Sequence, residues 1–280
     1  MYSQLALEEF LKGNYSKAIE YYTKAIQLNP LDVAAYLGRG LAYDDLEQYD
    51  KAISDYTVAI KLNPDYADTY TGRGTAYSKL GQYDKAISDL TKAIKLNPDD
   101  AEVYNNRGLA YSGLGQYDKA LSDYTKAIKL DPDYADAYNN RGIAYSDLGQ
   151  YDKAISDLTK AIKLNPDDAA AYNNRGNVYL YFKQNNKAIS DYTKAIQLNP
   201  NDAHAYYNRG VAYRDLDQYE KAISDLTKAI KLNPDYAKAY YNRGIAYNKS
   251  GNTIKACKDW KKAYSLGYVD AKELLDRFCK

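Results

Sequence analysis

The spacing of the prolines constrains the fold of this chain more than any other feature. All seven prolines lie 34 residues apart: Pro30, Pro64, Pro98, Pro132, Pro166, Pro200 and Pro234. A fixed period of about 20–50 residues is the signature of a repeat architecture, in which each unit buries its apolar face on its neighbours. We therefore number the positions of each repeat as slots, with the proline at slot 32.

This numbering predicts eight tandem repeats and a short tail, with the first repeat shortened because Met1 falls at slot 3. The predicted repeats span residues 1–32, 33–66, 67–100, 101–134, 135–168, 169–202, 203–236 and 237–270. The tail, 271–280, is predicted to form a C-terminal capping helix. Its apolar stripe (Ala271, Leu274, Leu275, Phe278 and Cys279) would cover Trp260 and Cys257 of the last repeat.

Each repeat indicates two helices joined by a tight turn. In the fifth repeat, residues 135–148 carry small and apolar residues three and four apart, and Gly149 then interrupts the pattern. Residues 151–164 repeat the period until Asn165 and Pro166 end it, because proline cannot continue a helix. Asp167 is predicted to cap the next helix through its side-chain oxygen.

Small and large residues alternate in a way that predicts close helix packing. Slot 8 is glycine in seven repeats, and slots 20 and 27 are alanine in all eight. Large side chains occupy slots 4, 11, 17 and 24, for example Tyr138, Tyr145, Tyr151 and Leu158. These slots account for most of the 34 tyrosines, so we assign the tyrosines to the core rather than to a cofactor site.

This pattern resembles the tetratricopeptide repeat family over essentially the whole chain. The family signature places an aromatic residue, Leu-Gly, Tyr, Ala, an aromatic residue, Ala and Pro at fixed offsets, and successive repeats here match it. The resemblance implies an all-α fold, a right-handed α-solenoid superhelix of antiparallel helix hairpins. It also implies a protein-binding scaffold without catalysis.

Slot 7 departs from the family pattern, because arginine replaces the usual leucine. Seven repeats carry arginine at slot 7 and aspartate at slot 23, and the first repeat lacks both, having Leu5 and Tyr21. Their joint absence predicts salt bridges that join the two helices of a repeat or one repeat to the next, such as Arg141 with Asp157. An arginine ladder that binds phosphate or carboxylate groups is the alternative.

The sequence offers no catalytic, metal or cofactor site. The single histidine, His204, excludes imidazole-based triads and multi-histidine metal sites. The Gly38-Arg39-Gly40 run lacks the third glycine of a dinucleotide fingerprint and lies within a predicted helix. We therefore expect a chain that is not an enzyme and holds no cofactor.

Charge and composition narrow the class of partner. The formal net charge is +1 without a clustered basic face, which argues against nucleic acid. No apolar stretch approaches the roughly 20 residues of a membrane span. Two cysteines, Cys257 and Cys279, cannot form a disulfide framework across the chain, and they fit a reducing compartment. We therefore expect a cytoplasmic location and a protein or peptide partner.

Asparagine recurs at slot 6, on the face that the resemblance places in the concave groove. Slots 2, 5, 6, 9, 12 and 13 share one side of the first helix. Slot 6 is asparagine in five successive repeats: Asn106, Asn140, Asn174, Asn208 and Asn242. The array resembles the asparagine ladder of the O-linked N-acetylglucosamine transferase repeat domain, which holds extended peptides. A plain solvated surface is the alternative, and glycine replaces asparagine in repeats two and three (Gly38 and Gly72).

Other groove residues refine the expected ligand. The family's carboxylate clamp for acidic chaperone tails is matched at Asn177, Asn208 and Lys238, but Asn173 and Asn242 replace its other cations. We therefore do not expect binding of acidic tails, and Asn177 joins the predicted peptide-binding residues. Acidic groove residues favour a neutral or basic ligand: Asp44, Asp45, Asp68, Glu102, Asp136 and Asp147.

Aromatic residues interrupt the near-identity of the repeats at groove positions. Tyr181, next to Leu180, stands where other repeats carry small or polar residues, and Tyr207 and Tyr241 occupy slot 5. Exposed tyrosines are typical of binding hot spots, so we include these three in the predicted site. Neutral drift of the repeats is the alternative.

The two ends of the solenoid are expected to differ. Leu5, Leu7, Phe10 and Leu11 crowd a first helix without a preceding cover, which predicts weak homo-oligomers through this end. Three functions remain open: an adaptor that holds a peptide, a self-assembling structural module, and the binding domain of a larger protein.

Overall fold

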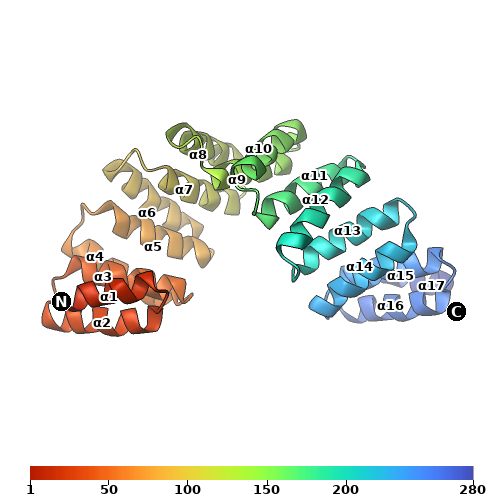
Figure 1. Cartoon of the computed structure of the whole chain (residues 1–280), viewed down its shortest axis with the longest axis horizontal. Coiled ribbons are helices and arrows are strands. Elements are labelled where there is room, and N and C mark those ends of the chain that lie inside the picture. The colour runs from red at the N-terminus through yellow and green to blue at the C-terminus, as the bar shows by residue number, and fades with distance from the viewer. Residues whose placement is uncertain (280) are drawn as a thin grey trace. The chain divides into compact units, whose positions relative to one another are not determined.

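The structure, a computed structural model, describes residues 1–279, which form 17 helices and no strand. The first helices of successive hairpins are α1 (Tyr2–Leu11), α3 (Val33–Asp45), α5 (Ala67–Lys79), α7 (Ala101–Gly113), α9 (Ala135–Asp147), α11 (Ala169–Tyr181), α13 (Ala203–Asp215) and α15 (Ala237–Lys249). The second helices are α2 (Tyr15–Leu28), α4 (Tyr49–Leu62), α6 (Tyr83–Leu96), α8 (Tyr117–Leu130), α10 (Tyr151–Leu164), α12 (Asn185–Leu198), α14 (Tyr219–Leu232) and α16 (Thr253–Ser265). The last helix is α17 (Ala271–Phe278). The chain is thus an all-α solenoid (Figure 1).

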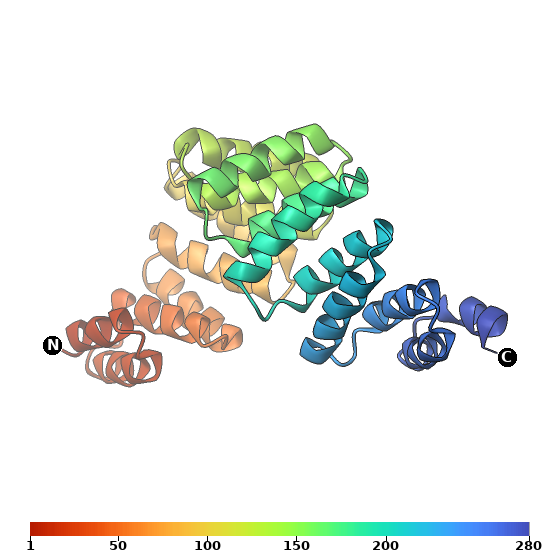
Figure 2. The same ribbon diagram turned by 45° about the vertical axis from the view of Figure 1, so that its right-hand side comes forward.

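Contacts divide the chain into two compact units, Met1–Ala144 and Tyr145–Lys280. Within each unit, every hairpin packs its second helix on the first helix of the next hairpin, as Figure 2 shows from a second direction. First helices also contact the next first helix, in the series α1, α3, α5, α7 and in the series α11, α13, α15. Described second helices make no comparable contacts with one another. The first helices therefore line the inner side of each unit.

The turns between hairpins differ in one detail from the sequence interpretation. Asp168, not Asp167, is the N-cap of α11, and its carboxylate accepts a hydrogen bond from the Ala170 amide. The Asp167 amide instead donates to Asn165 Oδ1 at 3.3 Å. The Asn165 side chain therefore stabilises the turn, and Asp168 rather than Asp167 caps the helix.

Slot 24 forms the centre of each hairpin. Its side chains are at most 5% exposed: Tyr22, Tyr56, Leu90, Tyr124, Leu158, Tyr192, Leu226 and Trp260. The slot-8 glycine opposite them is required by their size. A Cβ atom on Gly108 would lie 2.6 Å from Tyr124 Cε1, closer than real side chains approach. The sequence-based assignment of slot 24 to the core therefore agrees with the structure.

The tyrosines at slots 4 and 11 are mostly half-buried at the edge of the core, where several of them, such as Tyr77, Tyr111 and Tyr145, pack against buried residues. They flank the slot-7 arginines. The Arg107 guanidinium lies 5.8 Å from the ring centroid of Tyr104 and 5.9 Å from that of Tyr111. Most tyrosines at these slots therefore cover a cation in addition to bordering the core, a role that the sequence did not predict.

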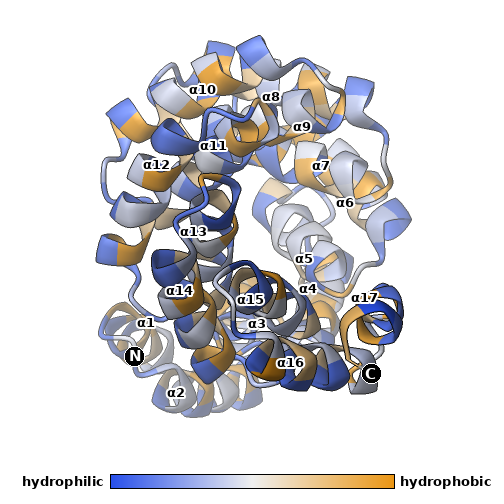
Figure 3. Ribbon diagram, turned by 90° about the vertical axis from the view of Figure 1, so that its right-hand side faces the viewer, coloured by the Kyte–Doolittle hydropathy of each residue, from blue (hydrophilic) through white to orange (hydrophobic). Residues whose placement is uncertain are grey.

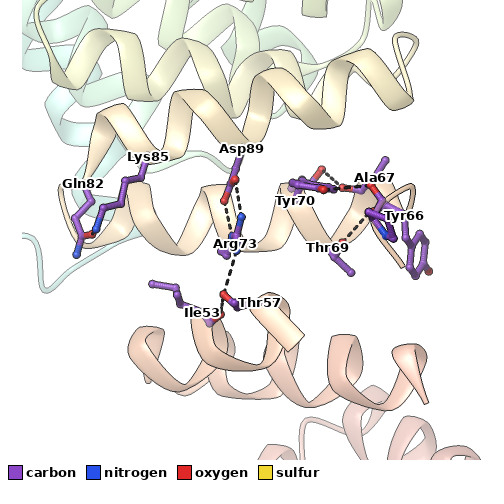
Figure 4. Close-up of polar contacts among 12 residues, drawn as sticks. Ile53, Thr57, Tyr66, Ala67, Thr69, Tyr70, Arg73, Gln82, Lys85 and Asp89 are labelled. Atoms are coloured by element: carbon purple, nitrogen blue, oxygen red, sulfur yellow. Dashed lines mark hydrogen bonds and ion pairs between the residues drawn. The ribbon is translucent and has the colours of Figure 1, made fainter. Parts of the chain in front are cut away.

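The slot-7 arginines join each hairpin to the preceding one. Arg73 donates two hydrogen bonds to Asp89, from Nε at 2.7 Å and from Nη2 at 2.9 Å, and a third from Nη1 to Thr57 at 3.1 Å (Figure 4). Asp89 belongs to the same hairpin as Arg73, whereas Thr57 belongs to the previous one. Six such arginine–aspartate pairs confirm the predicted salt bridge: 39–55, 73–89, 107–123, 175–191, 209–225 and 243–259. The pair of Arg141 and Asp157 stays a prediction.

The threonine contact was not predicted. Every slot-7 arginine donates from Nη1 to a slot-25 threonine of the preceding hairpin: Thr23, Thr57, Thr91, Thr125, Thr159, Thr193 and Thr227. In the six confirmed pairs, the guanidinium is therefore bonded on both edges and flanked by tyrosine. This engagement leaves the alternative of an anion-binding arginine ladder without support.

The structure corrects the interpretation of the two cysteines as reduced thiols. Cys257 on α16 and Cys279, directly after α17, form a disulfide with Cα atoms 5.6 Å apart. They are not the reduced thiols that a reducing compartment implies. The disulfide fixes α17 on α16, where Leu274 and Leu275 pack with Trp260. The hydropathy colouring shows the apolar side of α17 apart from its polar side (Figure 3).

Candidate functional site

Each of the predicted ladder asparagines with a described contact is bonded to the preceding repeat. In the first unit, Asn140 Nδ2 donates to Asn105 Oδ1 at 3.0 Å, and Asn106 Nδ2 lies 3.4 Å from Thr75 Oγ1. Both asparagines are half-buried on the inner row of helices. Part of their bonding capacity is therefore used within the protein, although an amide offers two donors and two acceptor sites.

The second unit gathers more of the predicted residues into direct contact. Asn208 Nδ2 donates to Asn177 Oδ1 at 3.0 Å and lies 3.3 Å from Asn173 Oδ1. Tyr192 also donates to Asn177 Oδ1, at 2.9 Å. Asn174 lies half-buried on α11, next to Asn173. Asn177 and Asn208 are thus held by the packing between two hairpins.

Asn242 and two predicted tyrosines form a further group on α13 and α15. Asn242 is 6% exposed, accepts from Arg214 and donates to the Tyr207 hydroxyl at 3.2 Å. Burial of Tyr207 raises the pKa of its hydroxyl. Tyr241 packs against Tyr268 with the rings tilted and their centroids 4.8 Å apart. Asn242 is therefore a buried structural residue more than a free groove amide.

Tyr181 lies outside these groups. It is 66% exposed and packs on Tyr151 and Phe182, with ring centroids at 4.5 and 5.7 Å. Leu180, predicted beside it on the groove, is instead half-buried against Ala188 and Tyr192. Tyr181 is therefore the most exposed of the three predicted hot-spot tyrosines.

Cavities line the inner surface of the first unit where the asparagine series is interrupted. Two cavities of about 330 and 310 Å³ share Leu37 and Leu41 of α3. The first cavity extends to Leu7 of α1, and the second extends to Gly72 of α5. Nearly all of their lining residues occupy slots 2, 5, 6, 9 and 12 of the first helices. We call this surface, around Leu7, Leu37 and Leu41, the leucine groove.

Glycines at slot 6 shape the leucine groove for a physical reason. A Cβ atom on Gly38 would lie 2.3 Å from Tyr22 Cζ, and one on Gly72 would lie 2.7 Å from Tyr56 Cζ. Because these buried rings reach the backbone of the next first helix, no side chain fits there. Tyr22 thus forms part of the floor of the first cavity, and the groove stays open where other repeats carry asparagine.

Carboxylates surround the second cavity. Its lining contains Asp44, Asp68, Asp100 and Glu102 and no lysine or arginine. Burial, reinforced by Asp45, raises the pKa of Asp44 to about 6. One of its oxygens, Oδ1, is buried without a hydrogen-bond partner. Of the acidic residues predicted for the groove, Asp44, Asp68 and Glu102 are therefore brought together, whereas Asp45, Asp136 and Asp147 do not line this cavity.

The predicted apolar end patch is divided by the structure. Leu7 is 45% exposed and faces the leucine groove, while Phe10 packs on Tyr15 at a centroid distance of 5.4 Å. Leu5 is half-buried, and Leu11 is 76% exposed. Of these four residues, only Leu11 thus presents a large apolar surface outside the groove.

Solved structures of known proteins share this architecture. The chain of an APC/C hetero-tetramer, Cut9-Hcn1, matches with a TM-score of 0.75 and 20% identity over 95% of this chain and 53% of that one. This chain thus spans about half the length of that relative. MamA matches with a TM-score of 0.55 and 31% identity over 61% of this chain and 94% of MamA. YrrB, described as a TPR protein with an unusual peptide-binding site, matches with a TM-score of 0.51 and 26% identity over 66% and 95% of the two chains.

Sequence comparison assigns the family. No curated protein is significantly similar to the chain. Models of the tetratricopeptide repeat match residues 4–67, 56–88, 101–134, 135–168, 169–202, 203–236 and 226–258, and a TPR repeat model matches 74–115. Together these matches run without a gap from residue 4 to residue 258. The chain belongs to the tetratricopeptide repeat family.

Proposed function

We propose that this chain is a non-catalytic scaffold that holds an extended segment of another protein along the inner row of its first helices. The observation that carries the proposal is the leucine groove, which exposes apolar side chains on slots that face inward. Soluble domains bury such surface unless a partner covers it. The similarity of the chain to YrrB, a protein described by its peptide-binding site, supports the same function.

The asparagine ladder is the second part of this proposal. Asn106, Asn140, Asn174, Asn208 and Asn177 would contact the backbone of the segment with the bonding capacity that inter-repeat contacts leave, whereas the buried Asn242 would hold Tyr207 in place. Each neutral hydrogen bond contributes about 0.5–1.5 kcal/mol net, so the ladder alone gives weak binding. Tyr181, Tyr207 and Tyr241 would supply apolar contact and sequence preference.

A peptide library displayed on phage and selected against the whole chain tests this proposal. We expect selected peptides to bind in solution and to lose affinity with Asn106→Ala, which removes only one long hydrogen bond within the protein. Tyr181→Ala should weaken some peptides and spare others. Failure to select any peptide would contradict the scaffold function, and peptides indifferent to Asn106→Ala would contradict the ladder.

Self-association is the second candidate function, and the exposed Leu11 favours it. Light scattering across a range of concentrations should show a mass that rises with concentration and falls with Leu11→Lys. A constant monomer mass for both proteins would exclude this function.

The partner and location follow from less direct observations. The balanced charge supports a protein partner over nucleic acid. Among residues 1–279, no helix combines the length and apolarity that crossing a membrane requires. The cytoplasmic location stays a prediction, and the disulfide argues against it, because disulfides persist mainly in oxidising compartments.

A further inference from the structure

We infer that the leucine groove selects a basic segment in which Lys or Arg residues flank an aliphatic side chain. This inference rests on the proposed scaffold function and names the class of ligand for one part of it. The occupant is a segment of a partner protein in extended form, bound across α1, α3 and α5.

The floor of the groove provides an aliphatic anchor site. Leu7 and Leu41 are 45% and 40% exposed, and Leu37 lies between the two cavities that they line. A cavity of about 330 Å³ exceeds the volume of one leucine side chain and suits an aliphatic residue with its neighbouring backbone. The exposed apolar surface would leave water when such a residue enters.

The edge of the groove determines the sign of the ligand's charge. Asp44, Asp68, Asp100 and Glu102 all line the second cavity, and Lys79, the cation that lowers the pKa of Asp44, lies outside the lining. Low-dielectric walls strengthen the field of charges that line a cleft. A lysine or arginine of the ligand would also favour the charged form of Asp44, which lines this cavity.

The corresponding surface of the second unit has a different character, which makes the acidic groove a local feature. At slots 2, 5 and 12, the last two full repeats carry His204, Tyr207, Arg214, Lys238 and Tyr241, without a carboxylate. The repeats share their fold and their Arg–Asp–Thr contacts, so the fold does not require the acidic residues. Charge complementarity therefore points to a basic ligand in the first unit alone.

The experiment uses fluorescein-labelled peptides with Lys-Leu-Lys units separated by glycine, and anisotropy with the full chain at low salt. Peptides with Glu-Leu-Glu and Lys-Ser-Lys units are the controls for charge and for the anchor. We expect the Lys-Leu-Lys peptide to bind about tenfold more tightly than either control, since each exposed charge pair adds roughly a two- to fivefold gain. Added salt should weaken this binding.

Matched variants locate the binding. Asp68→Asn with Glu102→Gln should weaken the Lys-Leu-Lys peptide about tenfold, and Leu41→Lys should abolish its binding. Asp84→Asn with Asp118→Asn removes the same charge from the first turns of α6 and α8, outside the groove, and should change nothing. Circular dichroism of all variants checks that the fold is kept.

The outcomes separate this inference from the proposed function. Equal binding of the Glu-Leu-Glu peptide, or equal loss in both double variants, would overturn the basic class of ligand. Uncharged library peptides that bind and are lost with Leu41→Lys would overturn it too, while the scaffold function would stand. Failure of every peptide to bind would overturn both.

Discussion

Each repeat after the first has an arginine at slot 7, and these seven arginines connect neighbouring hairpins. In the first unit, Arg39, Arg73 and Arg107 each hold an aspartate of their own hairpin and a threonine of the hairpin before. The Arg73 and Asp89 side chains are 17% and 11% exposed. Removing one member of such a buried pair leaves the other charge without a partner.

We predict that Arg73→Met lowers the free energy of unfolding by about 3–5 kcal/mol, because Asp89 is left buried and unpaired. Thr57→Val removes two hydrogen bonds, the one from Arg73 and the one that the Thr57 hydroxyl donates to the Ile53 carbonyl, and should cost about 1–3 kcal/mol. Urea unfolding of the full chain measures both changes. Lys85→Ala is the control, since Lys85 is exposed and its contacts, a hydrogen bond to Gln82 and the ring of Tyr77, lie within its own hairpin. An Arg73 variant as stable as the Lys85 variant would contradict this account.

Asp44 predicts a pH dependence with a definite sign. Burial and Asp45 raise its pKa to about 6 from the ordinary 3.8, while Lys79 opposes them, and Asp44 in turn raises the pKa of Tyr56. Between these two pH values, the folded chain binds more protons at Asp44 than the unfolded chain does. The free energy of unfolding that Asp44 contributes therefore falls as the pH rises through this window.

Asp44→Asn removes the carboxyl whose ionisation lowers the free energy of unfolding. The substitution should therefore raise the unfolding temperature more above pH 6 than below pH 3.8. Thermal melts followed by circular dichroism measure the difference between variant and wild type. Asp65→Asn, which alters an exposed loop carboxylate, should give a small difference that does not change with pH. The same stabilisation by Asp44→Asn at both ends of the window would show that its carboxyl is not perturbed.

Residue-level prediction from the sequence succeeded where two changes coincided. Arginine and aspartate are both missing from the first repeat, which revealed their pairing. Thr23 is present in the first repeat, because its partner is Arg39 of the second repeat. Comparing the first repeat with the others therefore did not reveal the threonine contact. Its signal lies at the other end, where Lys261 replaces threonine in the last repeat.

At the scale of elements, helix limits follow closely from the proline and glycine punctuation, because those residues act locally. The fifth repeat was predicted as helices over 135–148 and 151–164, and the structure has Ala135–Asp147 and Tyr151–Leu164. The disulfide was missed, although Cys279 was placed on the apolar stripe that covers Cys257. Sharing one packed face was the signal that they lie close enough to bond.

We predict that the disulfide stabilises the last hairpin and its covering helix by about 3 kcal/mol, through the loop that it closes over 22 residues. Trp260, the single tryptophan, is 1% exposed beneath this helix and reports local unfolding by fluorescence. Reductant should lower the urea midpoint of this signal in the wild type. Cys279→Ser should show the lower midpoint with and without reductant, and an unchanged wild-type midpoint would contradict the prediction.

At the scale of the whole molecule, one repeat pattern presents two kinds of inner surface. The first unit has an apolar groove with carboxylates beside it, and the second unit has amides and tyrosines bonded to one another. The sequence predicted the inward slots and the acidic residues, because both follow from helical periodicity. It could not predict the leucine groove, because that depends on how far Tyr22 and Tyr56 reach across to the next helix.

The most direct test of the scaffold function is photo-cross-linking of a library-selected peptide to the full chain. A photoreactive residue is placed in turn at Leu41 and Thr71, on first helices, and at the exposed Lys51 and Lys85, on second helices. Binding along the inner row predicts adducts from Leu41 and Thr71 and none above background from Lys51 and Lys85. Adducts mainly from Lys51 and Lys85 would place the partner on the other side of the hairpins and contradict the central claim.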